Sequence, residues 1–471
     1  MLINLPQADG TAPLYLRLIK QIKQQIHSGK IAAGEKMPSL RRLAKDLGVS
    51  RTTAEAAYNQ LVAEGYLLAE PKRGYFAAGI AARPAEQKTT PEKAKSITPV
   101  RYDFGNNYID STLFPAAIWK RCLGHALENA QLLAGYGDPQ GEPYLRSTLA
   151  RYSHEARDVI CTPEQIVIGA GIQSLLEILL AIFAEADHAV ALEEPGFTKA
   201  EQIFKTAGWQ VSRFDSENLR PKLPQLLYVS PSNPYKGRSL SPQGRLNLLQ
   251  WARQTGGYIL EDDYNGEFRY FTHPIASLQG MSGGQNVIYC GSFSRILLPS
   301  LRISYLVLPQ SLLPAYSRVK HLYNQTSSSI EQFALAEFIA SGNLRRHIKK
   351  MRRRYAVKNT LLRSALAKIF GNKISIMAYE SGLHIRLAVH TGGTAQNLAK
   401  QALAAGIHIL PVAASASGTI SKPQTNYPNS ISNSAYADAN TATPEILLSF
   451  AGIAENDIEP ALKKLQEVWE L

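Results

Sequence analysis

The sequence predicts a multidomain protein with a small α+β domain, a large α/β domain with a mainly parallel sheet, and a smaller C-terminal α+β subdomain. Three observations support this. The chain has 471 residues, more than a single hydrophobic core usually serves. Its first eighty residues hold three short helical patterns followed by a basic hairpin pattern. Through the middle of the chain, helix-like and strand-like segments then alternate, as they do in α/β proteins.

The composition is that of a globular protein with a strong positive charge. Hydrophobic residues make up 45% and charged residues 19%, and the net charge is +13. Such a charge favours DNA or RNA as a partner, or else an enzyme that binds phosphorylated metabolites. The three cysteines lie far apart and have neither disulfide nor metal spacing, so we expect no metal site and a reducing, cytoplasmic location. We expect no signal peptide and no membrane role.

Two polar segments divide the chain. Residues 80–100 are rich in Ala, Lys, Pro and Thr without apolar periodicity, which predicts a flexible linker. Residues 413–443 are almost entirely small and polar, which predicts a loop inserted within a domain. The predicted domains are therefore 1–79 and 101–471, with the small subdomain beginning near residue 345.

The N-terminal patterns predict a helix-turn-helix followed by a β-hairpin wing. Leu14, Leu18, Ile22 and Ile26 have helical spacing. The segment SLRRLAKDLG predicts a second helix with Ser39 as N-cap, and Ser50 is placed to cap a third, SRTTAEAAYNQLVAEGYL. The segment GYLLAEPKRGYFAAG then reads as two short strands around a basic turn.

The second helix of such a motif lies in the DNA major groove and reads base edges from its N-terminal residues. Arg51 is therefore the candidate for bidentate contact with guanine. The other candidate contacts to phosphates or bases are Ser39, Arg41, Arg42, Ser50, Thr52, Thr53, Lys72 and Arg73. Eleven Lys and Arg against six Asp and Glu in residues 1–80 agree with this prediction. The alternative is a small protein-interaction domain with solvated charges.

The segment PSLRRLAKDLGVSRTTAEAAYNQLVAEGYL resembles the GntR-type winged helix nearly end to end. It departs from the family at the wing, where Lys72-Arg73-Gly74 stands in place of Gly-x-Gly.

The larger domain carries six motifs, which follow one another in the order YGDPQG, GAGIQSLLEIL, EEPGF, SPSNPYKG, EDDYNGEFRY and GSFSRILLPSLR. Together they resemble the fold-type I aminotransferases. With the winged helix in front, the chain resembles the MocR subfamily of GntR-type transcription regulators. This resemblance covers essentially the whole chain except the linker and the polar insertion.

The resemblance implies a site for pyridoxal 5′-phosphate. The phosphate would be bound by Gly171, Ile172 and Gln173 at a helix start, and by Ser292, Ser294 and Arg302. Tyr136 would reach the phosphate of the partner subunit in a head-to-tail homodimer. Asp262 would pair with the pyridine nitrogen. Asn233 and Tyr264 would hydrogen-bond the phenolic oxygen, and Phe197 would stack on the ring.

Two positions depart from the aminotransferase pattern. Arg295 occupies the place of the lysine that forms an imine with the cofactor, and a guanidinium stays protonated and is not a useful nucleophile. Leu447 in EILLSFAG replaces the arginine that clamps the substrate carboxylate. We therefore expect lost catalysis, with pyridoxal phosphate bound non-covalently or absent. Lys236 is a weak candidate substitute for the lysine, and Arg295 could instead add an anion site for pyridoxamine phosphate or another acidic metabolite.

Two further features are ambiguous. The basic run NLRRHIKKMRRRYAVK, residues 343–358, predicts an amphipathic helix that links the large and small domains, and the alternative is auxiliary contact with DNA phosphate. Glu261 and Asp263 flank Asp262 without a histidine nearby in the sequence, so we interpret them as strand-end carboxylates and predict no metal there.

Three functions remain open at this point. The first is a DNA-binding transcription regulator whose effector domain senses pyridoxal phosphate, a related vitamer or an amino acid, with an operator in double-stranded DNA as partner. The second is a pyridoxal-phosphate-dependent aminotransferase with an appended DNA-binding domain. The third is a constitutive DNA-binding dimer that binds no small molecule.

Overall fold

The computed structural model describes residues 13–79, 99–105, 108–128, 134–194, 196–219, 222–232, 239–263, 265–270, 275–412 and 443–471. Its contacts divide the chain into two compact units, residues 1–97 and 98–471. Apart from residues 99, 100 and 443, the expected linker and the polar insertion lie outside the described residues. Among the described helices, none has both the length and the apolar character needed to cross a bilayer.

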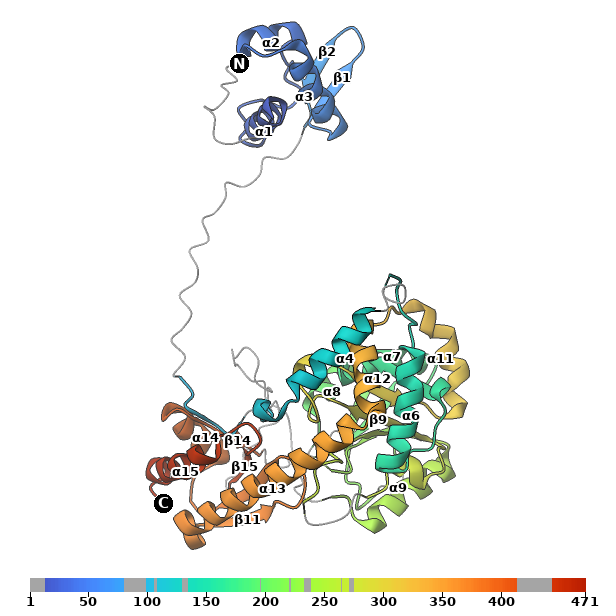
Figure 1. Cartoon of the computed structure of the whole chain (residues 1–471), viewed down its shortest axis with the longest axis vertical. Coiled ribbons are helices and arrows are strands. Elements are labelled where there is room, and N and C mark those ends of the chain that lie inside the picture. Colours follow the sequence, from blue (N-terminus) through green and yellow to red (C-terminus); the bar gives the residue numbers. More distant parts are fainter. Residues whose placement is uncertain are drawn as a thin grey trace. The chain divides into compact units, whose positions relative to one another are not determined.

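The smaller unit is a three-helix bundle with a two-stranded hairpin (Figure 1), whose elements are α1 Leu14–His27, α2 Leu40–Leu47, α3 Arg51–Ala63, β1 Leu67–Glu70 and β2 Gly74–Ala77. The side chains of Leu18, Ile22 and Ile26 are buried as their spacing predicts, together with Ile19, but Leu14 is 38% exposed. Leu14 is the first residue of α1, and the buried residues of this helix begin one turn later at Leu18.

The larger unit contains a seven-stranded sheet in the order β4-β10-β9-β8-β7-β5-β6. β10 is antiparallel to both its neighbours and every other adjacent pair is parallel. The strands are β4 Ile166–Gly169, β5 Ala189–Glu193, β6 Gln210–Phe214, β7 Leu226–Val229, β8 Tyr258–Asp262, β9 Val287–Ser292 and β10 Ser304–Val307. The strand-like segments of the sequence thus form this sheet, and the predicted mainly parallel α/β fold is confirmed.

Helices cover both faces of this sheet, which is why its strands are apolar on both sides (Figure 1). One face packs on α7 Ile172–Ile182, α8 Thr198–Thr206 and α11 Leu313–Val319. The other packs on α4 Ala116–Glu128, α6 Pro143–Arg157, α9 Pro242–Thr255 and α12 Ser329–Ala340. Successive side chains of β5 alternate between the two faces: Val190 and Leu192 belong to one hydrophobic core and Ala191 to the other. A short helix, α10 Leu278–Met281, precedes β9.

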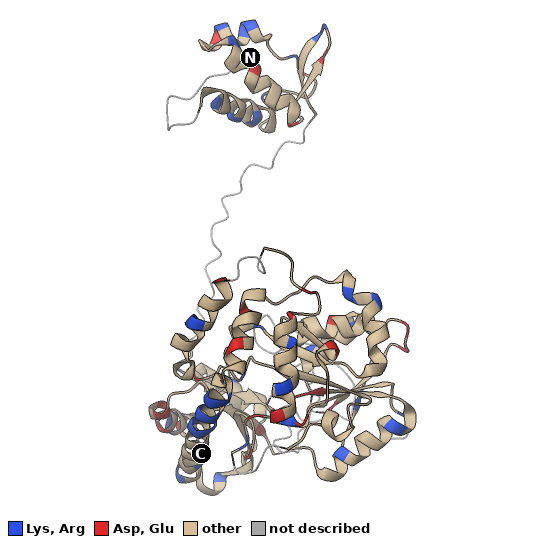
Figure 2. Cartoon of the chain, turned by 45° about the vertical axis from the view of Figure 1, so that its right-hand side comes forward, with Lys and Arg blue, Asp and Glu red and all other residues tan. Residues whose placement is uncertain are grey.

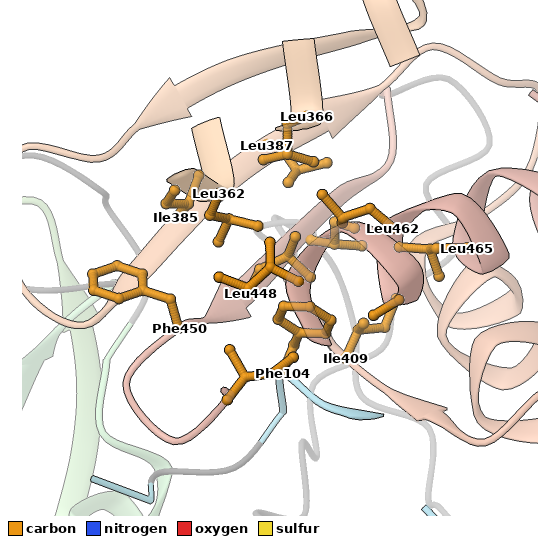
Figure 3. Close-up of a cluster of buried hydrophobic side chains, with 14 of the residues drawn as sticks. Phe104, Leu362, Leu366, Ile385, Leu387, Ile409, Leu448, Phe450, Leu462 and Leu465 are labelled. Atoms are coloured by element: carbon orange, nitrogen blue, oxygen red, sulfur yellow. The ribbon is translucent and has the colours of Figure 1, made fainter. Parts of the chain in front are cut away.

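The C-terminal part forms a second, antiparallel sheet in the order β11-β12-β15-β14. Its elements are α13 Asn343–Phe370, β11 Ile374–Ala378, β12 His384–Val389, α14 Ala395–Ala404, β14 Leu410–Pro411, β15 Glu445–Ser449 and α15 Glu455–Trp469, while β13 Ile407–His408 pairs with β3 Tyr102–Asp103. Figure 3 shows the core between this sheet and its helices, where Leu362 and Leu366 of α13 meet Leu448 of β15 and Leu462 of α15.

The basic run of the sequence lies on α13, whose apolar residues Leu344, Ile348, Met351 and Tyr355 are buried. Its exposed cations form a strip along the long helix beside the C-terminus in Figure 2, and they are Arg345, Arg346, Lys349, Lys350, Arg353 and Arg354. The amphipathic helix is confirmed. Whether the strip contacts DNA remains untested.

Candidate functional site

Polar residues of the smaller unit gather at the starts of α2 and α3. Ser39 and Ser50 cap these helices, since the Ser39 Oγ accepts from the Arg42 N–H at 3.3 Å and the Ser50 Oγ from the Thr53 N–H at 3.1 Å. The Ser50 hydroxyl also lies 2.7 Å from the Thr52 hydroxyl. The serines therefore hold the helix starts in place, while the side chains of Arg51 and Thr52 extend into solvent.

The wing presents a second set of cations. β1 and β2 pair from Leu67 with Ala77 to Glu70 with Gly74, and the turn between them carries Lys72 and Arg73. The Lys72 backbone is left-handed, with φ of 62°. Arg73 forms an ion pair with Glu70 and lies 5.4 Å from the centre of the Phe76 ring. Of these two cations, Lys72 is therefore the one without an ion pair within the turn.

The larger unit contains a cavity of about 290 Å³ at the carboxyl edge of the seven-stranded sheet. β5, β7, β8 and β9 contribute residues at or just after their ends, and the segment after β4 contributes the start of α7. The sheet order reverses between β5 and β7, and such reversal points are where open α/β sheets bind ligands. The opposite wall comes from the second sheet through His384 of β12, Leu410 of β14 and Leu447 of β15.

One end of the cavity is built to receive an anion. Gly171, Ile172 and Gln173 line it at the start of α7. The Gly171 N–H already donates to the Gly169 carbonyl at 2.9 Å, so the first N–H groups of the helix itself, those of Ile172 and Gln173, and the helix dipole favour negative charge there. The Arg302 guanidinium covers this turn and donates to the Ala170 carbonyl at 3.1 Å. A Cβ on Gly171 would lie 2.3 Å from the Arg302 Nη2, so only glycine allows this approach.

Three hydroxyls lie at the same end. The Ser304 hydroxyl donates to the Ser292 hydroxyl at 3.0 Å, and the Ser294 N–H donates to Ser292 at 3.3 Å. All three serines line the cavity. The structure therefore brings together Gly171, Ile172, Gln173, Ser292, Ser294 and Arg302 as the sequence predicts.

Asp262 lies at the end of β8 and is buried in the cavity wall. The Tyr228 hydroxyl donates to its Oδ2 at 2.5 Å. Burial raises the pKa of Asp262 to about 6, against the lowering effect of the Tyr228 hydrogen bond. The Phe197 ring stacks on Tyr228, with 6.4 Å between centroids. The result is a carboxylate beside aromatic rings, suited to a flat ligand with a positively charged ring nitrogen.

Arg295 follows the serine cluster and lines the same cavity with only 8% of its surface exposed. His384 also lines it and is 6% exposed. Burial, with the Arg295 charge, lowers the pKa of His384 to about 3, so its imidazole is neutral. Leu447 is buried in the wall. Arg386, opposite Leu447 in the sheet, pairs with Glu445 through its Nε at 2.7 Å and does not line the cavity.

Three residues named from the sequence, Asn233, Lys236 and Tyr264, lie outside the described residues. Tyr136 is described, and it is 96% exposed and does not line the cavity of its own chain.

Several other residues line the cavity that were not predicted from the sequence, namely Glu193, Lys199, Tyr228, Ser230, Ser304 and His384. Glu193, Tyr228 and Ser230 lie at or beside the carboxyl ends of predicted strands, so the strand-end rule for parallel sheets could have identified them. His384 belongs to the second sheet, and no local pattern marks it as a residue of this site.

The flanking carboxylates of the EDD segment have structural roles. Glu261 accepts from the N–H groups of Leu278 and Gln279 at 2.8 and 3.0 Å, which holds the start of α10. Asp263 accepts from the Arg157 Nε at 2.6 Å and from the Tyr289 hydroxyl at 2.8 Å. These bonds occupy the oxygens that a metal ion would need.

Two family models match this chain. Residues 14–76 match bacterial regulatory proteins of the gntR family, and residues 103–422 match aminotransferase class I and II.

Curated relatives share both parts. The chain is 36% identical to the HTH-type transcriptional regulator YdeL of Bacillus subtilis, over 98% of this chain and 97% of that protein. It is 30% identical to the probable rhizopine catabolism regulatory protein MocR of Rhizobium meliloti, covering 80% and 82%. It is 28% identical to the pyridoxine biosynthesis transcriptional regulator PdxR of Corynebacterium glutamicum, covering 82% and 86%.

Among solved structures, the kynurenine aminotransferase of Pyrococcus horikoshii, solved in complex with PMP, matches with a TM-score of 0.66 at 20% identity, covering 82% of this chain and 96% of that one. This likeness shows the aminotransferase fold of the larger unit. The chain therefore belongs to the MocR subfamily of GntR-type transcription regulators, DNA-binding proteins in which a winged helix-turn-helix precedes an aminotransferase-like domain.

Proposed function

We propose that the larger unit is a sensor that binds pyridoxal 5′-phosphate or a related vitamer without a covalent bond and has no aminotransferase activity. The observation that carries this proposal is the composition of one cavity. The anion-binding end, with Arg302 and the start of α7, and the ring-nitrogen carboxylate Asp262 are retained. Arg295 and Leu447 line the same cavity, and by the family resemblance they occupy the positions at which catalysis requires a nucleophilic amine and a carboxylate clamp.

The described residues fit a pyridine ring that carries a phosphate. The left-handed Gly171 leaves room for Arg302 against the helix start, an arrangement of donors that no neutral ligand requires. Burial raises the pKa of Asp262, and no cation of the described residues offsets this rise. A protonated pyridine nitrogen would supply such a cation. When bound, the cofactor provides an electron-withdrawing ring. The printed name of the relative PdxR, a pyridoxine biosynthesis regulator, also favours a vitamer.

On the DNA side, we propose that Arg51 reads a base edge in a double-stranded operator. Arg41, Arg42 and Lys72 would contact phosphates, with Ser39, Ser50, Thr52, Thr53 and Arg73 supporting or adding contacts. Arg51→Gln should therefore relax sequence preference at one position, whereas Lys72→Gln should weaken binding to all sequences and lower the salt slope by roughly one.

The working form is proposed to be a head-to-tail homodimer in the cytoplasm. Tyr136 supports the dimer because an aromatic side chain 96% exposed in its own chain is available to the cavity of a second one. Sedimentation of the full chain should give twice the monomer mass, and Tyr136→Ala should weaken phosphate binding.

A direct test incubates the full chain with pyridoxal 5′-phosphate, measures bound stoichiometry, and looks by mass spectrometry for a covalent adduct after borohydride reduction. We expect about one bound ligand per chain, because the proposal places one vitamer in the cavity of each chain, and we expect no covalent adduct. An adduct lost in Lys236→Ala would instead favour the working aminotransferase, as would turnover in a transaminase assay with a panel of amino acids. Absence of binding would favour the constitutive DNA-binding dimer.

A further inference from the structure

The long helix α13 has a charge pattern that neither the cavity nor the winged helix explains. Its 28 residues contain ten Lys and Arg and not one Asp or Glu. Six of these cations are exposed and lie along one side of the helix (Figure 2), where they form what we call the basic strip: Arg345, Arg346, Lys349, Lys350, Arg353 and Arg354.

α15, which packs against α13, shows that an exposed helix of this subdomain does not need such a pattern. α15 carries acidic and basic residues together, and its Glu459 forms ion pairs with Lys463 of the same helix and with Lys368 of α13, each at 3.2 Å. Mixed signs of this kind are typical of a solvated helix surface. The absence of acidic residues from α13 is therefore not a requirement of the fold.

The cations of the basic strip repel one another. Lys349 stands four residues after Arg345 and four before Arg353, and like charges at this spacing destabilise a helix. Arg354 forms an ion pair with Glu455 at 3.0 Å, and among the described residues no carboxylate pairs with the other five cations. A surface that keeps such charges without neutralising them favours a polyanionic partner.

The shape of the strip also fits a polyanion. All of its cations except Arg345 line an open groove of about 410 Å³, to which Leu113 and Val357 add a small apolar part. This lining is too polar to receive the apolar face of a peptide helix. From Arg345 to Arg354 the strip spans about 14 Å. Over that length one strand of B-DNA presents on the order of four phosphates.

We propose that the basic strip binds the phosphate backbone of DNA outside the site of the winged helix, so that the larger unit supplies a sequence-independent part of the DNA affinity. DNA is the polyanion favoured here because the same chain carries a DNA-binding domain. The covalent link between the two units raises the effective concentration of bound DNA at the strip. Lys and Arg contacts to phosphates carry no base information, and they release counterions, which makes them sensitive to salt.

The test measures the affinity of the full chain for DNA by fluorescence anisotropy over a range of salt concentrations. The probe is a fragment selected beforehand for binding to this protein and extended on each side by about 30 base pairs of flanking DNA, roughly 100 Å. A second probe of the same length has an unrelated sequence. The strip variant combines Lys349→Gln, Lys350→Gln and Arg353→Gln, which places good helix formers at exposed positions.

Each lost phosphate contact lowers the slope of log affinity against log salt by about 0.9, so the slope of the strip variant should be shallower by about 2.7. Raising the salt from about 50 to about 200 mM should then weaken wild type roughly fortyfold more than the variant. At a fixed salt concentration, both probes should lose affinity by a similar factor. An unchanged slope would overturn the proposal, as would a loss confined to the selected sequence.

The matched control combines Lys120→Gln, Arg151→Gln and Arg253→Gln, which removes three exposed cations from α4, α6 and α9. It changes the net charge by the same amount as the strip variant and should keep the wild-type slope. If its slope falls as far, net charge rather than the strip governs DNA binding, and the proposal is wrong.

A charge-conserving variant separates charge from helix structure. Lys349→Arg, Lys350→Arg and Arg353→Lys in combination keep every positive charge of the strip and should keep the wild-type slope. A slope as shallow as that of the strip variant would show that these positions act through the structure of α13 rather than through phosphate contacts, and would also overturn the proposal.

Discussion

At the scale of single residues, Arg295 leaves the cavity able to bind a ligand but provides no nucleophilic amine for catalysis. A lysine at this position can lose its proton when desolvated, whereas a guanidinium cannot, so this side chain decides whether position 295 offers a reactive amine. Among the described residues, the surrounding cavity combines a helix start suited to an anion with a buried carboxylate, Asp262.

We therefore predict that Arg295→Lys regains covalent attachment of pyridoxal 5′-phosphate. The new amine would be buried beside His384 and Arg302 in the same cavity, which favours its deprotonated form. Mass spectrometry after borohydride reduction should detect one adduct per chain in this variant and none in wild type. Transamination should stay low, because Leu447 still occupies the clamp position. An adduct of equal yield in wild type would contradict this account of Arg295.

Asp262 gives a prediction about pH. Its pKa of about 6 lies above the ordinary value, so in the folded chain it is ionised only above that pH. A ligand with a protonated ring nitrogen needs the ionised form, so affinity for pyridoxamine 5′-phosphate should fall as the pH is lowered from 7.5 to 5. Calorimetry of Asp262→Asn, which lacks the titrating group, isolates this effect from titration of the ligand phosphate. Equal pH dependence in the two proteins would exclude Asp262 as the cause.

Several of these residues could be identified from the sequence because they lie at strand ends and helix starts. Gly171, Asp262 and Ser292 each follow or end a buried apolar run, and the topology of a parallel sheet brings such ends to one edge. His384 could not be found this way. Its role depends on how the second sheet closes over the first, which no local pattern encodes.

At the scale of elements, the wing combines backbone strain with charge. Lys72 holds a left-handed backbone with φ of 62°, a conformation that favours glycine, and the family usually has glycines in this turn. A strained residue of this kind is retained where its side chain has a function.

Lys72→Gly should therefore stabilise the smaller unit by about 0.5–1 kcal/mol and at the same time weaken DNA binding. Thermal unfolding and fluorescence anisotropy measure the two effects. Lys72→Asn is the matched control, since asparagine tolerates the left-handed region but lacks the charge. If both variants bind DNA as wild type does, the Lys72 charge makes no contact with DNA.

A buried ion pair joins α6 to the residue that follows β8, next in the chain to the cavity residue Asp262. Arg157 and Asp263 are 2% and 0% exposed, and Asp263 also accepts from Tyr289. Removing the cation would leave a buried carboxylate without its charge partner, next in the chain to Asp262.

Arg157→Met should accordingly lower the free energy of unfolding by about 3–5 kcal/mol. Urea unfolding followed by tryptophan fluorescence reports on the larger unit alone, because all four tryptophans, Trp119, Trp209, Trp251 and Trp469, lie there. The matched control is Arg354→Met, which removes a half-exposed partner of Glu455 and should cost less than about 1 kcal/mol. Equal costs would mean that burial does not govern these pairs.

At the scale of the whole molecule, a DNA-binding unit and a ligand cavity lie in separate compact parts of one chain. Periodicity, helix caps and turn residues are local signals, so the helices of the winged domain and the strands of the large sheet could be predicted from them. The arrangement of the two parts during regulation is not a local property. It depends on how the two units are joined and, in the proposed homodimer, on how two chains pair, and no local sequence pattern specifies either.

If the larger unit is a sensor, occupancy of its cavity changes DNA binding. The most direct test compares the affinity of the full chain for a DNA fragment, selected beforehand for binding to this protein, with and without saturating vitamer. Because coupling between two sites is a shared free energy, we predict a change in DNA affinity of about fivefold or more, and the same factor in vitamer affinity when DNA is present. Arg302→Gln should show no change at the same vitamer concentration. An unchanged DNA affinity, measured while calorimetry confirms that the cavity is filled, would contradict the claim.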